Sequence, residues 1–174
     1  MKKNIAVIGC GHWGKNLVRN FAELDALAAV CDPNNQLAKS YAEQYNVDNL
    51  SIAAILANPA IEGVVLAVPA RLHASMAVGL MNAGKHVFVE KPLAMNKIDA
   101  ETMIASAEEN NVHLMVGHLL QYHPIFMTVR KLVESKELGD LSYIYSNRLS
   151  FGKVRSEEDV IWSFAPHDVS MILS

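Results

Sequence analysis

The feature that most constrains this chain is a glycine run at the point where an apolar strand gives way to an amphipathic helix. Gly9, Gly11 and Gly14 follow the apolar segment 5–8 and open residues 13–24, where apolar residues recur at helical spacing. In such a unit the first glycine allows a tight turn, the second lets a pyrophosphate approach the backbone, and the third allows close helix packing. The run therefore predicts a dinucleotide site at the helix N-terminus, with His12 and Trp13 at the cofactor's edge.

An acidic residue follows the second apolar run at the spacing that a dinucleotide site requires. Asp32 ends the run 26–31, about 20 residues beyond the glycines, where a carboxylate accepts hydrogen bonds from ribose hydroxyls. A carboxylate there repels a 2′-phosphate, and no arginine follows it through residues 33–36. NAD is therefore favoured over NADP as the cofactor. The alternative is a plain glycine turn with Asp32 acting as a helix cap.

Composition excludes several classes of partner. The 174 residues are 51% hydrophobic, and 15 basic against 18 acidic residues give a net charge of −3. No cluster of Lys or Arg forms a nucleic-acid footprint, and no apolar run has membrane-spanning length. The apolar stretch after the two N-terminal lysines lacks the cleavage pattern of a signal peptide. We expect a small-molecule substrate, no nucleic acid and no membrane.

The cysteines and histidines indicate neither a disulfide framework nor a metal site. Cys10 and Cys31 are the two cysteines of the sequence, and neither belongs to a CxxC pair. Their sparse use fits a reducing, cytoplasmic compartment. We expect both to be small buried hydrophobic residues rather than reactive thiols. No histidine pair has metal-ligand spacing with a supporting carboxylate, so no metal is predicted.

Strand and helix patterns alternate through the first two-thirds of the chain. Apolar runs predict strands at 4–9, 26–31, 61–68, 86–89 and 112–116. Between them lie predicted helices at 13–24, 35–45, 51–57 and 71–83, the last closed by Gly84, and one that begins near Asn96. This rhythm predicts a Rossmann-type α/β fold, a doubly wound parallel sheet that forms an NAD(P)-binding domain over residues 1–122.

The pattern changes after Gly117 and predicts the start of an α+β domain over residues 123–174. Pro124 opens an apolar helical pattern that Gly139 is placed to stop, and residues 141–151 then alternate with period two, as in a long half-exposed strand. One strand cannot bury its own apolar face, and the chain ends inside a helical pattern at 169–173, so we expect a truncated product or fragment. Another alternative is a homo-oligomer that pairs the exposed strands at 141–151.

A lysine stands at the carboxyl edge of the predicted sheet. Glu90, Lys91 and Pro92 directly follow the strand at 86–89, and open α/β sheets bind ligands at that edge. Lys91 could donate to a substrate hydroxyl, hold a cofactor ribose or shift the pKa of a neighbouring base. The alternative is a surface lysine paired with Glu90.

Four motifs together resemble the glucose–fructose oxidoreductase/inositol dehydrogenase/MocA (Gfo/Idh/MocA) family. They are the glycine run, the segment from Ala67 to His73 (Ala-Val-Pro-x-x-x-His), the segment 83–94 (Ala-Gly-Lys-His through Glu-Lys-Pro-Leu-Ala), and Ala165-Pro166-His167-Asp168. The resemblance covers essentially the whole chain, although family members usually continue well past this length. It implies hydride transfer between NAD(P) and a carbinol carbon of a sugar, cyclitol or nucleotide sugar.

The same resemblance implies roles for individual residues. Lys91 would contact both substrate and cofactor, and the bond that joins it to Pro92 is often cis in the family. His167 resembles the family's general base, which takes the hydroxyl proton as hydride leaves. The cofactor site would also include Ala67, Val68, Pro69 and Glu90, with His73 near the nicotinamide.

One departure from the family pattern bears on catalysis. Many relatives carry an aspartate four residues before the histidine, where this chain has Ser163. Serine cannot stabilise an imidazolium as a carboxylate does, so either Asp168 substitutes, Lys91 acts alone, or catalysis is impaired. Another interpretation of His167 is a residue at a helix start after Pro166. The alternative function is a catalytically silent NAD-binding protein that lacks most of its substrate domain.

Overall fold

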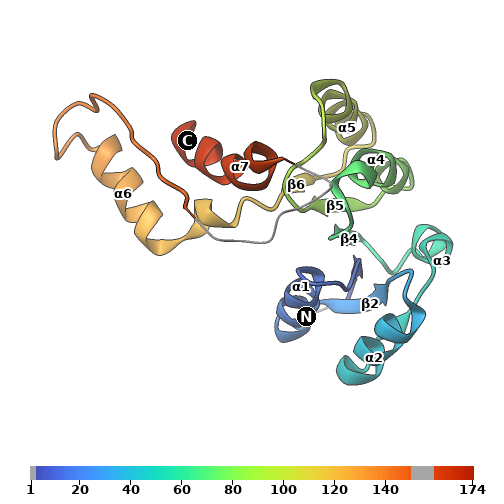
Figure 1. The fold of residues 1–174 in the computed structure, drawn as a ribbon. Helices are drawn as coiled ribbons and strands as arrows, with labels where there is room; N and C mark the ends of the chain where they lie inside the picture. The colour runs from blue at the N-terminus through green and yellow to red at the C-terminus, as the bar shows by residue number, and fades with distance from the viewer. Residues whose placement is uncertain (1–2, 150–158) are drawn as a thin grey trace. The chain divides into compact units, whose positions relative to one another are not determined.

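The computed structural model describes residues 3–149 and 159–174 of the chain (Figure 1). The chain divides into two compact units, residues 1–117 and 118–174, whereas the sequence patterns place the boundary between residues 122 and 123. The first unit consists of one parallel sheet and its crossover helices. The second consists of helices and an extended segment.

The sheet of the first unit has six parallel strands. They are β1 (Ile5–Ile8), β2 (Leu27–Cys31), β3 (Asp48–Asn49), β4 (Gly63–Leu66), β5 (His86–Val89) and β6 (Leu114–Val116). Their order is β3-β2-β1-β4-β5-β6, so the chain winds outward in both directions from β1 and β4. This order confirms the predicted Rossmann-type sheet.

Five α-helices connect these strands, as the blue-to-green course of Figure 1 shows. They are α1 (Gly14–Glu23), α2 (Asn35–Tyr45), α3 (Ile52–Ala57), α4 (His73–Asn82) and α5 (Lys97–Glu109), with a 3₁₀ turn (Ala70–Leu72) before α4. The residues that directly precede α2, α3 and α5 cap these helices. The side chains of Asn34, Ser51 and Asn96 each accept a hydrogen bond from an N–H group of the first turn. Gly84 follows α4 in the left-handed conformation, with φ of 75°, as predicted.

Alternating residues of the strands face two separate buried clusters. Ile8 of β1 packs in one cluster, to which α4 and α5 contribute Leu80 and Met103. The next residue back along the strand, Val7, packs in the other cluster with Val18 of α1. Successive strand side chains point to opposite faces, so this arrangement shows that helices cover both faces of the sheet.

The strand predictions differ from the structure mainly at their ends. The run 61–68 contributes four residues to β4, because the residues after Leu66 leave the ladder. The two-residue strand β3 had no predicted counterpart, since a pair of polar residues gives no periodic signal.

The second unit contains a 3₁₀ turn (Leu119–Tyr122), α6 (Pro124–Glu134) and α7 (Val160–Ile172). Helix α6 begins at Pro124 as predicted, but it ends at Glu134, well before Gly139. Lys136 takes the left-handed conformation, with φ of 56°, and this reverses the chain earlier than glycine would. Pro166 lies inside α7, so the interpretation of His167 as a helix-start residue is wrong.

A strand was predicted at 141–151. The structure describes residues 141–149 of this range, and these residues form no strand. Those residues form no ladder with another segment, and a strand exists only where a partner accepts its hydrogen bonds. Residues 150 and 151 lie outside the described residues. Among the described helices, none has the length and apolar character needed to cross a membrane.

A buried lysine joins the segment after α3 to the segment before β5. Lys85 is 5% exposed, and its Nζ donates to the carbonyl oxygen of Asn58 at 2.7 Å and to that of Ile61 at 2.8 Å. The charge is therefore neutralised by backbone dipoles rather than by a carboxylate. Both carbonyl groups precede β4, so the ammonium helps to hold the start of that central strand.

We expect Lys85→Met to lower the free energy of unfolding by about 3 kcal/mol, because two hydrogen bonds from a charged donor are lost while the side-chain stem remains. Urea unfolding followed by circular dichroism measures this change. The matched control is Lys97→Met, since the Lys97 side chain is 84% exposed and its Nζ lies 3.4 Å from Glu101 Oε1. That control should change stability by less than about 0.5 kcal/mol. Equal effects of the two substitutions would contradict a structural role for Lys85.

Candidate functional site

Four strand ends meet at the carboxyl edge of the sheet. In the strand pairing Ile8 lies opposite both Cys31 and Leu66, and Leu66 lies opposite Val89. The residues that follow these strands, from Gly9 to Glu90, therefore gather at one edge. Because β2 and β4 lie on either side of β1, this edge is the topological switch point at which α/β sheets bind ligands.

Close backbone contacts of the glycine loop explain why glycine stands at two of its positions. Gly9 has φ of 94°, and a Cβ there would lie 2.4 Å from the carbonyl oxygen of Ala67. A Cβ on Gly14 would lie 1.8 Å from the carbonyl oxygen of Gly9. At Gly11, by contrast, a Cβ would meet no atom within 4 Å. The loop is thus tight at its two ends and open in its middle.

Helix α1 presents an uncapped N-terminus beside this opening. Trp13 occupies the N-cap position, its side chain makes no capping hydrogen bond, and the first turn contains no acidic residue. The N–H groups of Lys15 and Asn16 donate to the carbonyl oxygens of Gly11 and Trp13, at 3.1 and 2.9 Å, so it is the helix dipole at this end that favours an anion. His12 is exposed in the same loop.

The carboxylate of Asp32 holds the glycine loop against the end of β2. Its Oδ2 accepts a hydrogen bond from the backbone N–H of Cys10 at 2.7 Å, and its Oδ1 accepts one from Asn34 at 2.8 Å. The cap of α2 is Asn34, so the interpretation of Asp32 as a helix cap is wrong. Each carboxylate oxygen has a second lone pair, which leaves Asp32 able to accept further hydrogen bonds.

A pocket of about 640 Å³ lies between these segments, within the usual range for small-molecule sites. Backbone and apolar groups provide most of its wall, and Asp32 is the charged residue among the described residues that line it. The lining residues are Ile8, Gly9, Gly11, Cys31, Asp32, Pro33, Asn35, Asn49, Leu50, Ser51, Ile52, Ala67, Val68, Pro69, Leu72 and Met76.

The segment after β5 is tied to the glycine loop by a side-chain hydrogen bond. Trp13 Nε1 donates to Glu90 Oε1 at 2.8 Å, and Glu90 Oε2 accepts from the backbone N–H of Lys91 at 3.3 Å. Burial raises the pKa of Glu90, while these hydrogen bonds oppose the rise. The bond between Lys91 and Pro92 is cis, as the resemblance implied. Lys91 itself is half-buried.

His73 is enclosed at the start of α4 rather than open to the pocket. Its ring is 1% exposed, with Nδ1 2.8 Å from the carbonyl oxygen of Pro92 and Nε2 2.9 Å from that of Val68. Both ring nitrogens thus face backbone oxygens. A contact of these nitrogens with the nicotinamide would require those hydrogen bonds to be replaced.

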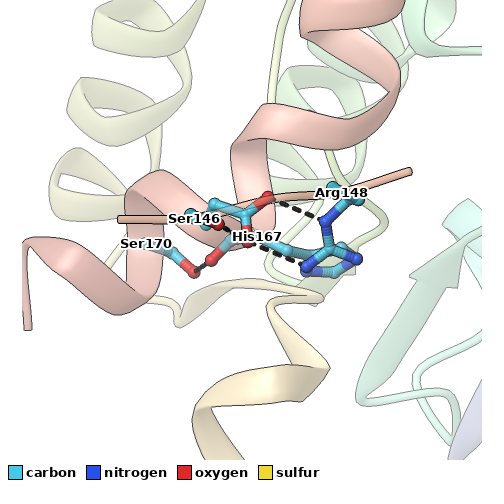
Figure 2. A network of polar contacts seen from close by, with 5 residues as sticks. Ser146, Arg148, His167 and Ser170 are labelled. Atoms are coloured by element: carbon cyan, nitrogen blue, oxygen red, sulfur yellow. Dashed lines mark hydrogen bonds and ion pairs between the residues drawn. The ribbon is translucent and has the colours of Figure 1, made fainter. Parts of the chain in front are cut away.

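In the second unit, His167 lies on α7 with its ring packed edge-to-face against His118, the ring centroids being 6.1 Å apart. Ser163 lies one turn earlier on the same helix. The neighbouring Asp168 accepts hydrogen bonds from Arg148 Nε at 2.7 Å, Arg148 Nη2 at 3.0 Å and Ser146 Oγ at 3.2 Å. Figure 2 shows Arg148 and Ser146 beside the part of α7 that carries His167. Asp168 is thus bound to the guanidinium of Arg148, and this hydrogen bonding lowers the pKa of Asp168.

Sequence reasoning missed several of these contacts. The pocket wall formed by Asn49, Leu50, Ser51 and Ile52 depends on β3, which gave no signal. The hydrogen bond from Trp13 to Glu90 joins residues far apart in the chain, and no local sequence pattern predicts it. The burial of His73 could not be predicted either, because the sequence pattern around a histidine at a helix start is the same whether the side chain is buried or exposed.

Both cysteines are buried beside the site, and neither thiol is activated. Cys10 is 1% and Cys31 8% exposed, and Cys10 Sγ lies 3.8 Å from the carbonyl oxygen of Cys31. Burial, followed by the nearby charge of Asp32, raises the pKa of Cys10 to about 12. Burial likewise raises the pKa of Cys31.

We expect neither thiol to react with iodoacetamide at about pH 8 in the folded protein, since a raised pKa keeps the thiol protonated well above that pH. Mass spectrometry of the intact chain should show no adduct until denaturant is added, and then one adduct on each cysteine. Rapid labelling of the native protein, in the absence of unfolding, would contradict this prediction.

Comparisons with known proteins agree with this arrangement. The Gfo/Idh/MocA family model, described as an oxidoreductase family with an NAD-binding Rossmann fold, matches residues 3–118. UDP-N-acetylglucosamine 3-dehydrogenase of Acidithiobacillus ferrooxidans is 31% identical over 169 residues, which make up 96% of this chain and 52% of the relative. The chain thus spans about half the length of this relative.

Solved structures give the same result. A putative myo-inositol dehydrogenase of Sinorhizobium meliloti superposes with a TM-score of 0.74 at 30% identity, over 78% of this chain and 42% of that one. A 3-ketoreductase of Actinomadura kijaniata, solved with NADP and TDP-benzene, gives a TM-score of 0.72 at 25% identity, over 78% and 43%. Because the family match spans the whole parallel sheet, this chain belongs to the Gfo/Idh/MocA family of oxidoreductases with an NAD-binding Rossmann fold.

Proposed function

We propose that this chain binds NAD in the pocket at the carboxyl edge of its sheet. We also propose that the protein transfers hydride between the nicotinamide and a carbinol carbon of a sugar, cyclitol or nucleotide sugar. The observation that carries the proposal is the pocket itself, which combines an open Gly11, an uncapped helix end and a carboxylate, close in the fold to the Lys91 segment. The relatives that the chain resembles act, by their names, on an inositol and on a nucleotide sugar.

Backbone groups bind the pyrophosphate in this proposal. The space beside Gly11 lets two phosphate groups come close to the main chain, where the dipole of α1 attracts them. The described lining contains no lysine or arginine, so the attraction comes from fixed dipoles rather than from mobile cations.

Asp32 binds the adenosine ribose in this proposal and discriminates between NAD and NADP. Its carboxylate is held by Cys10 and Asn34 and has lone pairs left to accept from the ribose hydroxyls. A 2′-phosphate would meet this carboxylate with no cation in the described lining to offset the repulsion. The relatives include an enzyme solved with NADP, so this local chemistry, rather than family membership, favours NAD.

Oxidation of a carbinol removes a hydride from carbon and a proton from oxygen, and reduction returns both. The bound dinucleotide supplies the acceptor or donor of the hydride. Lys91 donates to the substrate hydroxyl and orients it. In oxidation the hydroxyl proton passes to a neutral Lys91 amine or to a neutral His167 imidazole, and in reduction the same group, now protonated, returns it. Asp168 binds Arg148 and its charge also interacts with His167, so the chain offers a carboxylate beside the imidazole although Ser163 cannot.

Asp32→Ala tests the cofactor assignment. We expect the wild-type chain to bind NADH at least about 10-fold more tightly than NADPH, and the substitution to weaken NADH binding by about 10- to 100-fold, the value of a charge-assisted hydrogen bond. Titration followed by nicotinamide fluorescence measures both affinities. Asp48→Ala is the matched control, since Asp48 is exposed and outside the pocket lining. Equal affinity of the wild-type chain for NADH and NADPH would overturn the assignment.

Lys91→Met tests the catalytic assignment. We expect it to lower turnover by at least about 100-fold, the range of lost proton transfer, while NADH affinity stays within about 3-fold. Turnover is screened with myo-inositol, scyllo-inositol, glucose and UDP-N-acetylglucosamine, with Lys97→Met as the control. If the folded, NADH-binding wild-type chain turned over none of these substrates, the proposed hydride transfer would be contradicted, in favour of a protein that only binds the nucleotide.

A further inference from the structure

The ring of His73 lies between two backbone carbonyl groups. Nδ1 is 2.8 Å from the oxygen of Pro92 and Nε2 is 2.9 Å from the oxygen of Val68, both within hydrogen-bond distance. His73 is 1% exposed, so water does not replace either hydrogen-bond partner of the ring. A carbonyl oxygen only accepts hydrogen bonds, so both ring nitrogens need to donate.

A neutral imidazole cannot do this. It carries one N–H group and one nitrogen with a lone pair, and that lone pair would face a carbonyl oxygen at contact distance. An imidazolium donates from both nitrogens and satisfies both oxygens. A buried charge needs a compensating one. Burial raises the pKa of Glu90, and a charge on His73 acts against that rise, so Glu90 is the acidic group that faces such a charge.

The two carbonyl groups belong to connecting segments outside the strands of the sheet. Val68 follows β4 and lines the pocket, while Pro92 lies in the connection between β5 and α5 and has no N–H group to donate. The ring of His73 therefore links the pocket wall to the residue directly after Lys91. On the other side of Lys91, Glu90 is held by Trp13. Lys91 thus stands between two residues that side chains of α4 and the glycine loop hold in place.

We propose that His73 is a buried imidazolium that acts as a positioning residue, its two N–H groups tying Pro92 to Val68 and so fixing the backbone that carries Lys91. The catalytic part of this inference rests on the role of Lys91 in the proposed function. The link that His73 makes between Pro92 and Val68 does not depend on that role, so it can be tested without substrate and without turnover.

The protonation state is measured by NMR on the wild-type chain labelled with ¹⁵N at its seven histidines. At about pH 8, where an exposed histidine is neutral, the His73 ring should show two protonated nitrogens, assigned through contacts with the side chains of Val68 and Pro92. A spectrum with one protonated and one bare nitrogen would overturn the imidazolium. Because this experiment uses the wild-type chain, it does not depend on a variant that folds.

The positioning role is tested with His73→Gln and His73→Leu. We expect amide hydrogen exchange at residues 90–96 to quicken by at least about 10-fold in His73→Leu and less in His73→Gln, whose amide can still donate to one carbonyl oxygen. NADH affinity should stay within about 3-fold in both. His113→Gln, at an exposed position before β6, is the matched control and should leave exchange at 90–96 unchanged. Unchanged exchange in folded His73→Leu would overturn the positioning role.

Turnover separates this inference from the proposed function. If Lys91 is catalytic, His73→Leu should lower kcat by at least about 10-fold with little change in cofactor affinity, and His73→Gln should restore part of it. Faster exchange at 90–96 without any wild-type turnover would support the link while contradicting the proposed hydride transfer. A loss of kcat with unchanged exchange would contradict the link alone.

Discussion

The site depends on how closely the backbone of the glycine loop approaches the end of β4. Gly9 leaves no room for a side chain against Ala67, and Gly14 leaves none against Gly9. These contacts place the start of α1 over the switch point of the sheet and leave Gly11 open between them. A side chain at either tight position would push the start of α1, and with it the helix dipole, away from the loop. The opening is therefore a product of packing in the loop rather than of any group that lines it.

Three side chains then fix the strand ends that this packing brings together. Asp32 ties β2 to the loop through Cys10, Trp13 ties the loop to Glu90 after β5, and His73 ties Pro92 to Val68 after β4. Each link joins segments that are adjacent in space but distant in sequence. Loops at the carboxyl edge have no ladder hydrogen bonds, so such links replace the rigidity that the strands provide further down. Pre-organisation of this kind lowers the entropy that binding would otherwise lose.

The sequence predicted what repeats along the chain or sits beside a recognisable turn. Alternating apolar runs predicted five of the six strands and the helices between them, and the glycine run and Asp32 lie at the sheet edge where the pocket is found. The misses have specific causes. β3 is too short for periodicity, α6 ends where Lys136 adopts a positive φ, and residues 141–149 alternate without a partner to pair with. The position of His73 depends on two oxygens from other loops, and no local pattern encodes that.

Recognition and chemistry use different physical means in this fold. In the proposed function, backbone dipoles of the pocket attract the pyrophosphate and the carboxylate of Asp32 repels an extra phosphate, so this selectivity needs no mobile side chain. Lysine carries its amino group on a flexible four-carbon stem, so Lys91 gains precision only if its backbone is held. The contacts at Glu90 and Pro92 supply that restraint on both sides of it. The pocket wall and the backbone on both sides of Lys91 can therefore share one sheet edge, because separate hydrogen bonds hold them.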